Sequence, residues 1–114
     1  MVPRFGSAVL VLTTAFGSCA SNSGSITLAN KSSEPIAHAE ISICRQTLTI
    51  DDLAVGQEAS RNYRVNCEDG YSVRVRFQSG REISNDDIGY VTGGMDFRHT
   101  LIVTDRELQI AFRQ

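Results

Sequence analysis

The chain has 114 residues, of which 41% are hydrophobic and 21% charged. This composition is that of a globular protein and excludes a disordered or fibrous one. Its 13 acidic residues outnumber its 11 lysines and arginines, so attraction of the whole surface to nucleic acid is not expected. The length is enough for one compact domain with a small core.

The first 18 residues have the order of a secretory signal peptide. Arg4 is the basic residue near the start, and residues 5–16 carry no charge and include the apolar run 8–12. A membrane-spanning helix needs about 20 apolar residues, and this stretch is shorter and leads into a linker rich in Ser, Asn and Gly. We therefore predict that residues 1–18 direct export and are then removed.

The end of this segment, Phe16-Gly17-Ser18-Cys19, resembles the lipobox of bacterial lipoproteins, in which an apolar residue and two small residues precede a cysteine. The resemblance implies cleavage before Cys19 and attachment of acyl chains such as palmitate, which anchor the protein in a membrane. Ala20 stands where lipoproteins retained in the inner membrane of enteric bacteria have Asp, which implies an outer-membrane lipoprotein that faces the periplasm. Residues 19–24 would then be the lipidated cysteine and a short tether.

An ordinary secretory signal is the alternative to the lipobox. Ser18-Cys19-Ala20 also fits the small-x-small pattern of a signal peptidase site. Cleavage after Ala20 would remove Cys19 and release a soluble periplasmic protein.

The chain has three cysteines, an odd number that would leave one thiol unpaired in an exported protein. A lipid on Cys19 removes this difficulty, and we then predict a disulfide between Cys44 and Cys67. In the chain-entropy model, the loop that this bond closes contributes about 3 to 4 kcal/mol to stability. A zinc site is the weaker alternative, because the chain has no Cys-x-x-Cys spacing. No metal or other cofactor is expected.

Residues 25–114 are predicted to form one all-β domain. Alternation of apolar and polar residues, interrupted by clusters of Asn, Asp, Ser, Gly and Pro, indicates short strands. Seven or eight such strands without an amphipathic helix favour a small antiparallel β-sandwich of immunoglobulin-like or transthyretin-like type. A small barrel is the second choice. The predicted strands, in chain order, are 26–29, 37–43, 47–50, 63–67, 71–77, 88–92, 101–104 and 108–112.

The clearest strand is 71–77, in which every odd position is apolar and every even position is polar. Residues 63, 65 and 67 form a matching apolar face, and between the two runs Glu68-Asp69-Gly70 contains an Asp-Gly pair, which favours a hairpin turn. We therefore expect these two strands to pair. Cys44 follows on the polar side of the run 37–43, so that strand must end before Cys44 or contain a bulge.

If the hairpin around Gly70 forms, Arg64, Arg74 and Arg76 project from one outer face of the sheet, with Arg81 near the next turn. Guanidinium groups suit carboxylate and phosphate, so this positive stripe is a candidate contact for an acidic partner. The alternative is an ordinary solvated strand surface, because charged side chains keep a sheet soluble.

Residues 89–97 place Tyr90, Met95 and Phe97 beside the pair Gly93-Gly94. Aromatic and methionine side chains on a loop are typical contact residues, so these three are a second candidate for contact with a partner. Alternatively, a tight turn whose apolar neighbours fold back onto the core explains the same residues.

The sequence has no catalytic signature: it lacks a Gly-x-Ser-x-Gly motif, a phosphate-binding glycine loop and a His-Glu-x-x-His motif. His38 is expected on the polar side of its strand and His99 just before a strand, each as an ordinary surface or edge residue. We therefore expect a non-enzymatic, lipid-anchored envelope protein that binds another protein or an envelope component.

Two other functions remain open. The chain could be a small periplasmic inhibitor or immunity protein that blocks an incoming enzyme such as lysozyme, or a structural accessory subunit of an envelope assembly. An inserted polar loop would favour the inhibitor, and an exposed edge strand would favour the accessory subunit.

Overall fold

The computed structural model describes residues 22–112, which form eight β-strands. The signal segment 1–18 and Cys19 lie outside the described residues. Within residues 22–112 we find no helix with the length and apolar character needed to cross a membrane. The strands are β1 (Asn22–Asn30), β2 (Ile36–Ile43), β3 (Gln46–Leu53), β4 (Glu58–Val65), β5 (Asp69–Phe77), β6 (Glu82–Val91), β7 (Phe97–Val103) and β8 (Leu108–Phe112).

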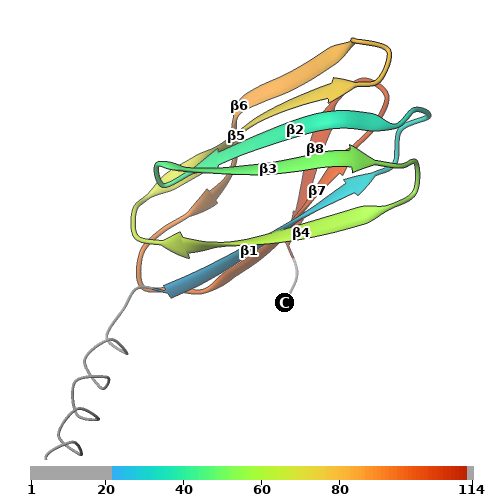
Figure 1. Ribbon diagram of the computed structural model, residues 1–114. Helices are drawn as coiled ribbons and strands as arrows, with labels where there is room; N and C mark the ends of the chain where they lie inside the picture. The colour runs from blue at the N-terminus through green and yellow to red at the C-terminus, as the bar shows by residue number, and fades with distance from the viewer. Residues whose placement is uncertain (1–21, 113–114) are drawn as a thin grey trace, which may run out of the picture.

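The strands form two four-stranded sheets that pack face to face (Figure 1). Sheet A has the order β4-β1-β7-β8, and sheet B has the order β3-β2-β5-β6. This arrangement confirms the prediction of an all-β sandwich of seven or eight strands. One pair departs from the expected antiparallel arrangement, because β1 and β7 run parallel with Gly24 opposite Phe97. The starts of β1 and β7 therefore lie at the same end of the sandwich.

The core lies between the two sheets and is formed by side chains from alternate strand positions. In β5 every odd position from 71 to 77 is buried, while Arg74 and Arg76 are exposed, which confirms the predicted alternation. Large buried side chains from the other strands complete the core: Ile26, Leu28, Ile36, Ile41, Ile43, Ile50, Val65 and Leu101.

The expected hairpin around Gly70 is wrong. β4 belongs to sheet A, whereas β5 belongs to sheet B and pairs with β2 and β6, so residues 66–68 cross from one sheet to the other. An Asp-Gly pair favours a turn through its backbone, but here both residues lie in β5. The Asp69 carboxylate instead accepts hydrogen bonds from the N–H groups of Cys44, at 3.0 Å, and Gly70, at 2.9 Å.

A two-residue hairpin turn joins β2 to β3. Ile43 pairs with Gln46, which leaves Cys44 and Arg45 in the turn, and both have positive φ angles, 47° and 63°. Positive φ at both central positions is the backbone of a type I′ turn, which usually contains Asn and Gly. β2 thus ends before Cys44, and the turn explains why Cys44 can be buried although it follows the polar side of the strand.

β1 begins at Asn22, earlier than the predicted domain start at residue 25. Gly24 is opposite Tyr63 of β4, and a Cβ atom at position 24 would lie only 2.3 Å from the Tyr63 ring. Residues 22–24 of the predicted tether are therefore part of the sandwich. Only residues 20 and 21 separate Cys19 from the first strand.

Candidate functional site

One end of the sandwich gathers most of the features that the sequence singles out, and we call it the disulfide end. It consists of the β2–β3 turn, the β4–β5 connection 66–68, the β6–β7 connection 92–96 and the first residues of β1. Strand pairing places them together, because Asn22 is opposite Val65 and Asp69 is opposite Val91. In Figure 1 this is the end where β1, drawn in blue, begins.

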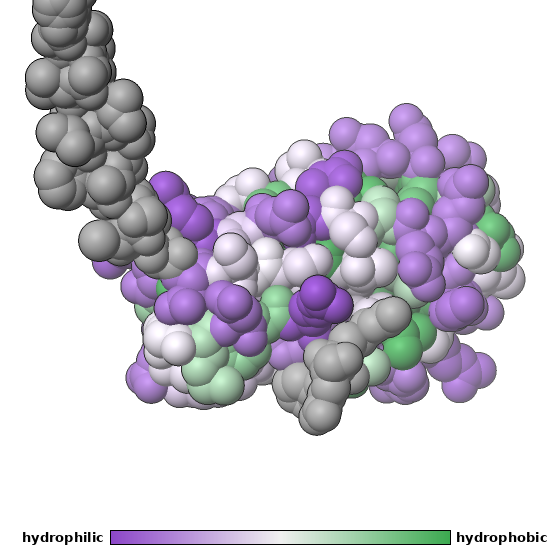
Figure 2. All heavy atoms as spheres, turned by 90° about the horizontal axis from the view of Figure 1, so that it is seen from below, coloured by the Kyte–Doolittle hydropathy of each residue, from purple (hydrophilic) through white to green (hydrophobic). Residues whose placement is uncertain are grey.

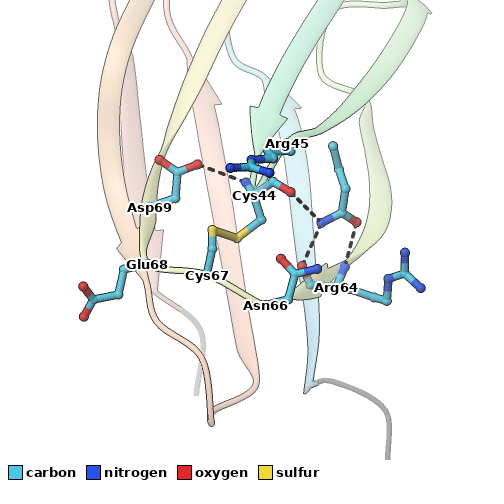
Figure 3. Close-up of a pocket in the computed structure, with 8 residues that line it drawn as sticks. Cys44, Arg45, Arg64, Asn66, Cys67, Glu68 and Asp69 are labelled. Carbon is cyan, nitrogen blue, oxygen red and sulfur yellow. Dashed lines mark hydrogen bonds between the residues drawn. A yellow bond between two sulfur atoms is a disulfide. The ribbon is translucent and has the colours of Figure 1, made fainter. Parts of the chain in front are cut away.

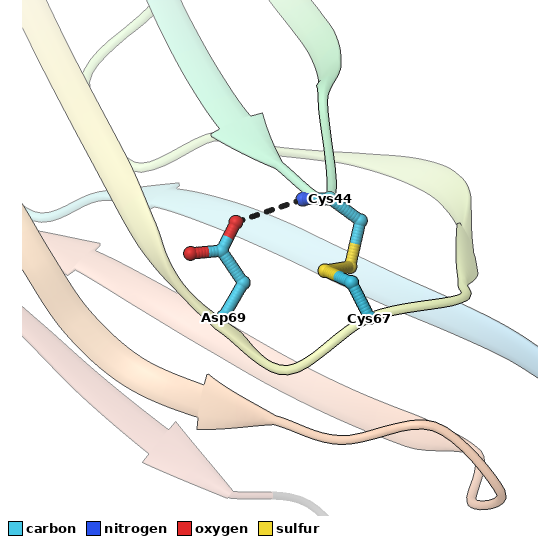
Figure 4. Close-up of side chains that lie close together, drawn as sticks. All are labelled: Cys44, Cys67 and Asp69. Carbon is cyan, nitrogen blue, oxygen red and sulfur yellow. Dashed lines mark hydrogen bonds between the residues drawn. A yellow bond between two sulfur atoms is a disulfide. The ribbon is translucent and has the colours of Figure 1, made fainter.

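Cys44 and Cys67 form a disulfide with their Cα atoms 5.6 Å apart (Figure 4), which confirms the predicted pair. The bond joins the β2–β3 turn of sheet B to the connection that leaves sheet A. The two sulfurs and the Asp69 carboxylate lie within 4.8 Å of one another, a spacing that would suit metal ligands. Because the sulfurs are bonded to each other, they supply no thiolates, and the structure favours the disulfide over the zinc alternative.

An open cleft of about 840 Å³ lies beside the disulfide (Figure 3). Gln46 holds one wall together, because its side-chain amide donates to the Arg64 carbonyl at 2.8 Å and its oxygen accepts from the Arg64 N–H at 2.9 Å. These two hydrogen bonds join the edge of β3 to the edge of β4. The cleft is lined by Cys44, Arg45, Gln46, Arg64, Asn66, Cys67, Glu68 and Asp69.

The acidic groups of the cleft have hydrogen-bond partners, whereas its two arginines have no carboxylate partner in the described part of the chain. Asp69 is engaged by backbone N–H groups, and Glu68 accepts a hydrogen bond from the Tyr90 hydroxyl at 2.8 Å. Glu68 also raises the pKa of Tyr90 above its ordinary value. Within residues 22–112, neither Arg45 nor Arg64 pairs with a carboxylate. Two exposed guanidinium groups thus remain available for an anionic group.

The predicted positive stripe of Arg64, Arg74 and Arg76 is not formed. Arg64 lies on β4 in sheet A, while Arg74 and Arg76 lie on β5 in sheet B, because β4 and β5 do not pair. Arg74 is opposite Glu40, and Arg76 is opposite Glu82. Directly opposed side chains have Cβ atoms about 4.5 to 5.5 Å apart, so each of these two arginines has an acidic residue beside it on the outer face of sheet B.

The second set of predicted contact residues, Tyr90, Met95 and Phe97, is only partly exposed. Tyr90 and Met95 are exposed, at 52% and 55%, and both lie at the disulfide end. Phe97 is half-buried against the core, and its ring stacks on that of His99 with centroids 5.6 Å apart. Phe97 therefore follows the alternative interpretation, in which an apolar neighbour of the turn folds back onto the core.

The surface has no large continuous apolar region on the face shown in Figure 2, where hydrophobic side chains form small patches toward the two ends of the domain. Among the described residues, the exposed large hydrophobic side chains are Val55, Tyr90 and Met95. Val55 lies in the β3–β4 connection, at the opposite end of the sandwich from the disulfide.

The two histidines occupy different environments. His38 is half-buried on the outer face of sheet B, as expected, with Nδ1 2.6 Å from the Asp51 carboxylate and Nε2 3.4 Å from Glu40. These hydrogen bonds, first that of Asp51, raise the pKa of His38 above 6.5. His99 was expected at the surface before a strand, and this is wrong. It lies within β7 and is 1% exposed.

His99 belongs to a buried polar network that links the sheets. Its Nδ1 is 2.6 Å from the Tyr71 hydroxyl, which is 2.5 Å from the Tyr63 hydroxyl. Burial lowers the pKa of His99 and raises the pKa of both tyrosines. The predicted strand began at residue 101; extending the alternation upstream to Phe97 would have placed His99 on the core side.

Short loops at the end opposite the disulfide are tied together by Arg81. Its guanidinium contacts the Glu34 carboxylate at 2.9 Å and the Asp105 carbonyl at 2.6 Å, and lies 4.2 Å from the Phe77 ring centroid. The Asp105 carboxylate accepts hydrogen bonds from the N–H and hydroxyl of Ser33 at 2.7 and 2.8 Å. The backbone hydrogen bond from Ser33 is the main cause that lowers the pKa of Asp105. Arg81 thus fixes three connections relative to one another.

No protein-family model matches the chain, and no curated protein matches it. Two solved structures are similar to the chain. The NMR structure of a protein from Eubacterium rectale is 16% identical, with a TM-score of 0.59 over 82% of this chain and 90% of that one. Pneumolysin is 13% identical, with a TM-score of 0.43 over 80% of this chain and 23% of its own. The likeness to the Eubacterium rectale protein supports the all-β fold.

Proposed function

We propose that this protein is a lipid-anchored protein of the bacterial envelope whose β-sandwich binds another protein or an envelope component. The observation that carries the proposal is the Cys44–Cys67 disulfide. It accounts for two of the three cysteines and leaves Cys19, in its lipobox-like context, as the cysteine for the lipid. A structural disulfide is consistent with an extracellular or periplasmic location. The location that we propose is the periplasmic face of the outer membrane.

The rigidity of the loops supports a binding role. The longest connections between strands, 31–35 and 92–96, have five residues each. Side chains fix the loops at both ends, through Asp69 and Gln46 at the disulfide end and through Arg81 at the other end. A surface that is ordered before binding loses less entropy when it meets a partner. The domain therefore presents a preformed surface.

The inhibitor alternative receives no such support. Inhibition of an enzyme cleft by an inserted loop requires a segment that projects from the domain, and residues 22–112 contain no connection longer than those two. Two acidic residues of the connections are moreover held by hydrogen bonds, Asp96 from the Ser23 N–H and Asp105 from the Ser33 N–H. A loop-insertion inhibitor is therefore not the function that we propose.

A structural accessory subunit is the second candidate, and the edge of β8 favours it. Of the outer strands, β3 and β4 are joined to each other by hydrogen bonds of the Gln46 and Arg61 side chains. The outer strand β6 carries Asp86 and Asp87, and such charges discourage pairing with another strand. β8 (Leu108–Phe112) has no charged residue. A strand from another protein could add there. Amide exchange of β8 that is slower in the envelope than in the purified protein would support this role.

Replacement of Cys19 by serine tests the proposed anchor. In a bacterium that processes lipoproteins, the Cys19→Ser variant is expected to leave the membrane fraction or to remain as an uncleaved precursor, because serine cannot form the thioether to the lipid. The measurement is fractionation followed by immunoblotting.

The matched control is the double variant Cys44→Ser with Cys67→Ser, which removes the same chemical group elsewhere in the chain. It is expected to stay in the membrane fraction, although at a lower level because the domain is less stable. Membrane association of the Cys19→Ser variant equal to that of the natural chain would contradict the proposal.

A further inference from the structure

The disulfide end carries exposed apolar side chains next to the start of the domain. Tyr90 is 52% exposed and Met95 is 55% exposed. Tyr90 has an aromatic ring with a hydroxyl group, the combination that is enriched at membrane interfaces. Met95 has a flexible apolar side chain that adapts to irregular surroundings. Both side chains suit a contact with the boundary between lipid headgroups and acyl chains.

The loop that carries Met95 is fixed to the first strand. The Ser23 N–H donates a hydrogen bond to the Asp96 carboxylate at 2.9 Å, and Gly24 is opposite Phe97 in the parallel pair. A Cβ atom at Gly93 or Gly94 would meet no atom within 4 Å, so both glycines are at an open tip. In Figure 3 the orange β6–β7 connection extends beyond the disulfide.

The length of chain before β1 limits how far this end can lie from the anchor. β1 begins at Asn22, three residues after Cys19, and three extended residues span at most about 11 Å. This step rests on the proposed function, in which Cys19 carries the lipid. A lipid there would hold Ser23, and with it the Met95 loop, within a short distance of the headgroups.

The charges at this end suit a phospholipid surface. The carboxylates of Glu68, Asp69 and Asp96 are engaged by the Tyr90 hydroxyl or by backbone N–H groups. Arg45 and Arg64 have no carboxylate partner within residues 22–112. Their guanidinium groups can therefore contact lipid phosphate.

We propose that the disulfide end rests on the headgroup layer of the membrane that holds the anchor, with Tyr90 and Met95 in contact with lipid. The sandwich then stands on this end, and the loops around Arg81 and Val55 point away from the membrane. The tether sets the distance of the domain from the membrane, and the contact of the end loops sets its orientation. The surface left for a partner consists of the two outer sheet faces, the edge of β8 and the end opposite the disulfide.

Tryptophan fluorescence tests this orientation directly, because the chain has no tryptophan. The mature, lipidated Met95→Trp variant is reconstituted in vesicles of phosphatidylethanolamine and phosphatidylglycerol, with or without brominated acyl chains. We expect a blue shift of its emission and a loss of intensity in the brominated vesicles. The matched control is Val55→Trp, because Val55 is similarly exposed, at 50%, at the opposite end, and its emission is expected to be unchanged.

Each outcome has a defined meaning. Quenching of Met95→Trp but not of Val55→Trp supports the proposal, and a second probe, Tyr90→Trp, is expected to behave like the first. Equal emission of all three variants in brominated and ordinary vesicles, with the protein still floating with the vesicles, would overturn the orientation and leave the anchor standing. Quenching of Val55→Trp alone or equally would also overturn it. Failure to float, with an unmodified N-terminus, would instead reject the proposed function.

Discussion

Single residues in this protein owe their chemistry to the side of the sheet on which they lie. His38 faces outward between Asp51 and Glu40, whereas His99 faces the core beside Tyr71. The acidic neighbours favour the charged form of His38, and burial disfavours the charged form of His99. The pKa values of these two histidines are thus shifted in opposite directions within one small domain.

The two imidazoles are expected to titrate on opposite sides of pH 6.5, His38 above it and His99 below it. Nuclear magnetic resonance of the ring protons as a function of pH measures both values in one sample. The variant Asp51→Asn is expected to lower the pKa of His38 and leave His99 unchanged. Titration of both rings near 6.5 would contradict the acidic surroundings of His38 and the burial of His99.

These shifts also set the sign of the pH dependence of stability. The folded-state pKa of His38 is raised, so its contacts stabilise the fold below pH 6.5, and this contribution is lost as the pH rises through the raised pKa. The folded-state pKa of His99 is lowered, so its contribution is present above pH 6.5 and is lost as the pH falls through the lowered pKa. Both contributions are therefore present near pH 6.5; that of His38 is lost at higher pH and that of His99 at lower pH.

At the scale of strands, alternation predicted well which side chains are buried, and it predicted less well which strands pair. Tyr71 and Val73 are buried and Arg74 is exposed, because period-two alternation reflects the two faces of a sheet. Pairing depends on long-range contacts that the local sequence does not contain. The Asp69-Gly70 pair therefore gave a wrong prediction of a hairpin. The Asp69 carboxylate instead accepts a hydrogen bond from the N–H of Cys44, which is distant in the sequence.

The dependence of strand pairing on long-range contacts also explains which residues of the candidate site could be predicted from the sequence. Cysteine number and an odd thiol were enough to predict the Cys44–Cys67 bond, because they do not depend on strand pairing. The arginine stripe depended on the pairing of β4 with β5 and failed with it. The open guanidinium of Arg45 was missed, since nothing local marks Cys44 and Arg45 as a type I′ turn.

The pairing of β1 with β4 can be tested at Gly24. A methyl group there would overlap the Tyr63 ring, whose atoms lie 2.3 to 2.7 Å from the position of the added Cβ. The Gly24→Ala variant is expected to lose about 1 to 3 kcal/mol of unfolding free energy, the usual cost of overpacking. Urea denaturation of the mature domain provides the measurement.

Gly93→Ala is the control for this substitution. A Cβ at Gly93 meets no atom within 4 Å, and its φ is not positive, so the change in unfolding free energy should stay within about 0.5 kcal/mol. A similar loss in both variants would indicate a general effect of replacing glycine. A neutral Gly24→Ala variant would contradict the close packing of Tyr63 on β1.

For the whole molecule, the disulfide adds a side-chain cross-link between the β2–β3 turn of sheet B and the connection that leaves sheet A. Replacement of Cys44 and Cys67 together by alanine is expected to lower the free energy of unfolding by about 3 to 4 kcal/mol, according to the chain-entropy model. Denaturant unfolding of the variant and of the oxidised protein compares the two. A change smaller than about 1 kcal/mol would show that the sandwich holds itself together without the bond.

We propose that Cys19 anchors the chain and that the Cys44–Cys67 disulfide stabilises the fold. Intact mass spectrometry of the mature protein, purified from membranes of a bacterium able to process it and measured with and without reductant, tests both parts. We expect the mass of a chain that begins at acylated Cys19 and gains two hydrogen atoms on reduction. An unmodified chain that begins at Ser21 would contradict it and would make this a soluble periplasmic protein.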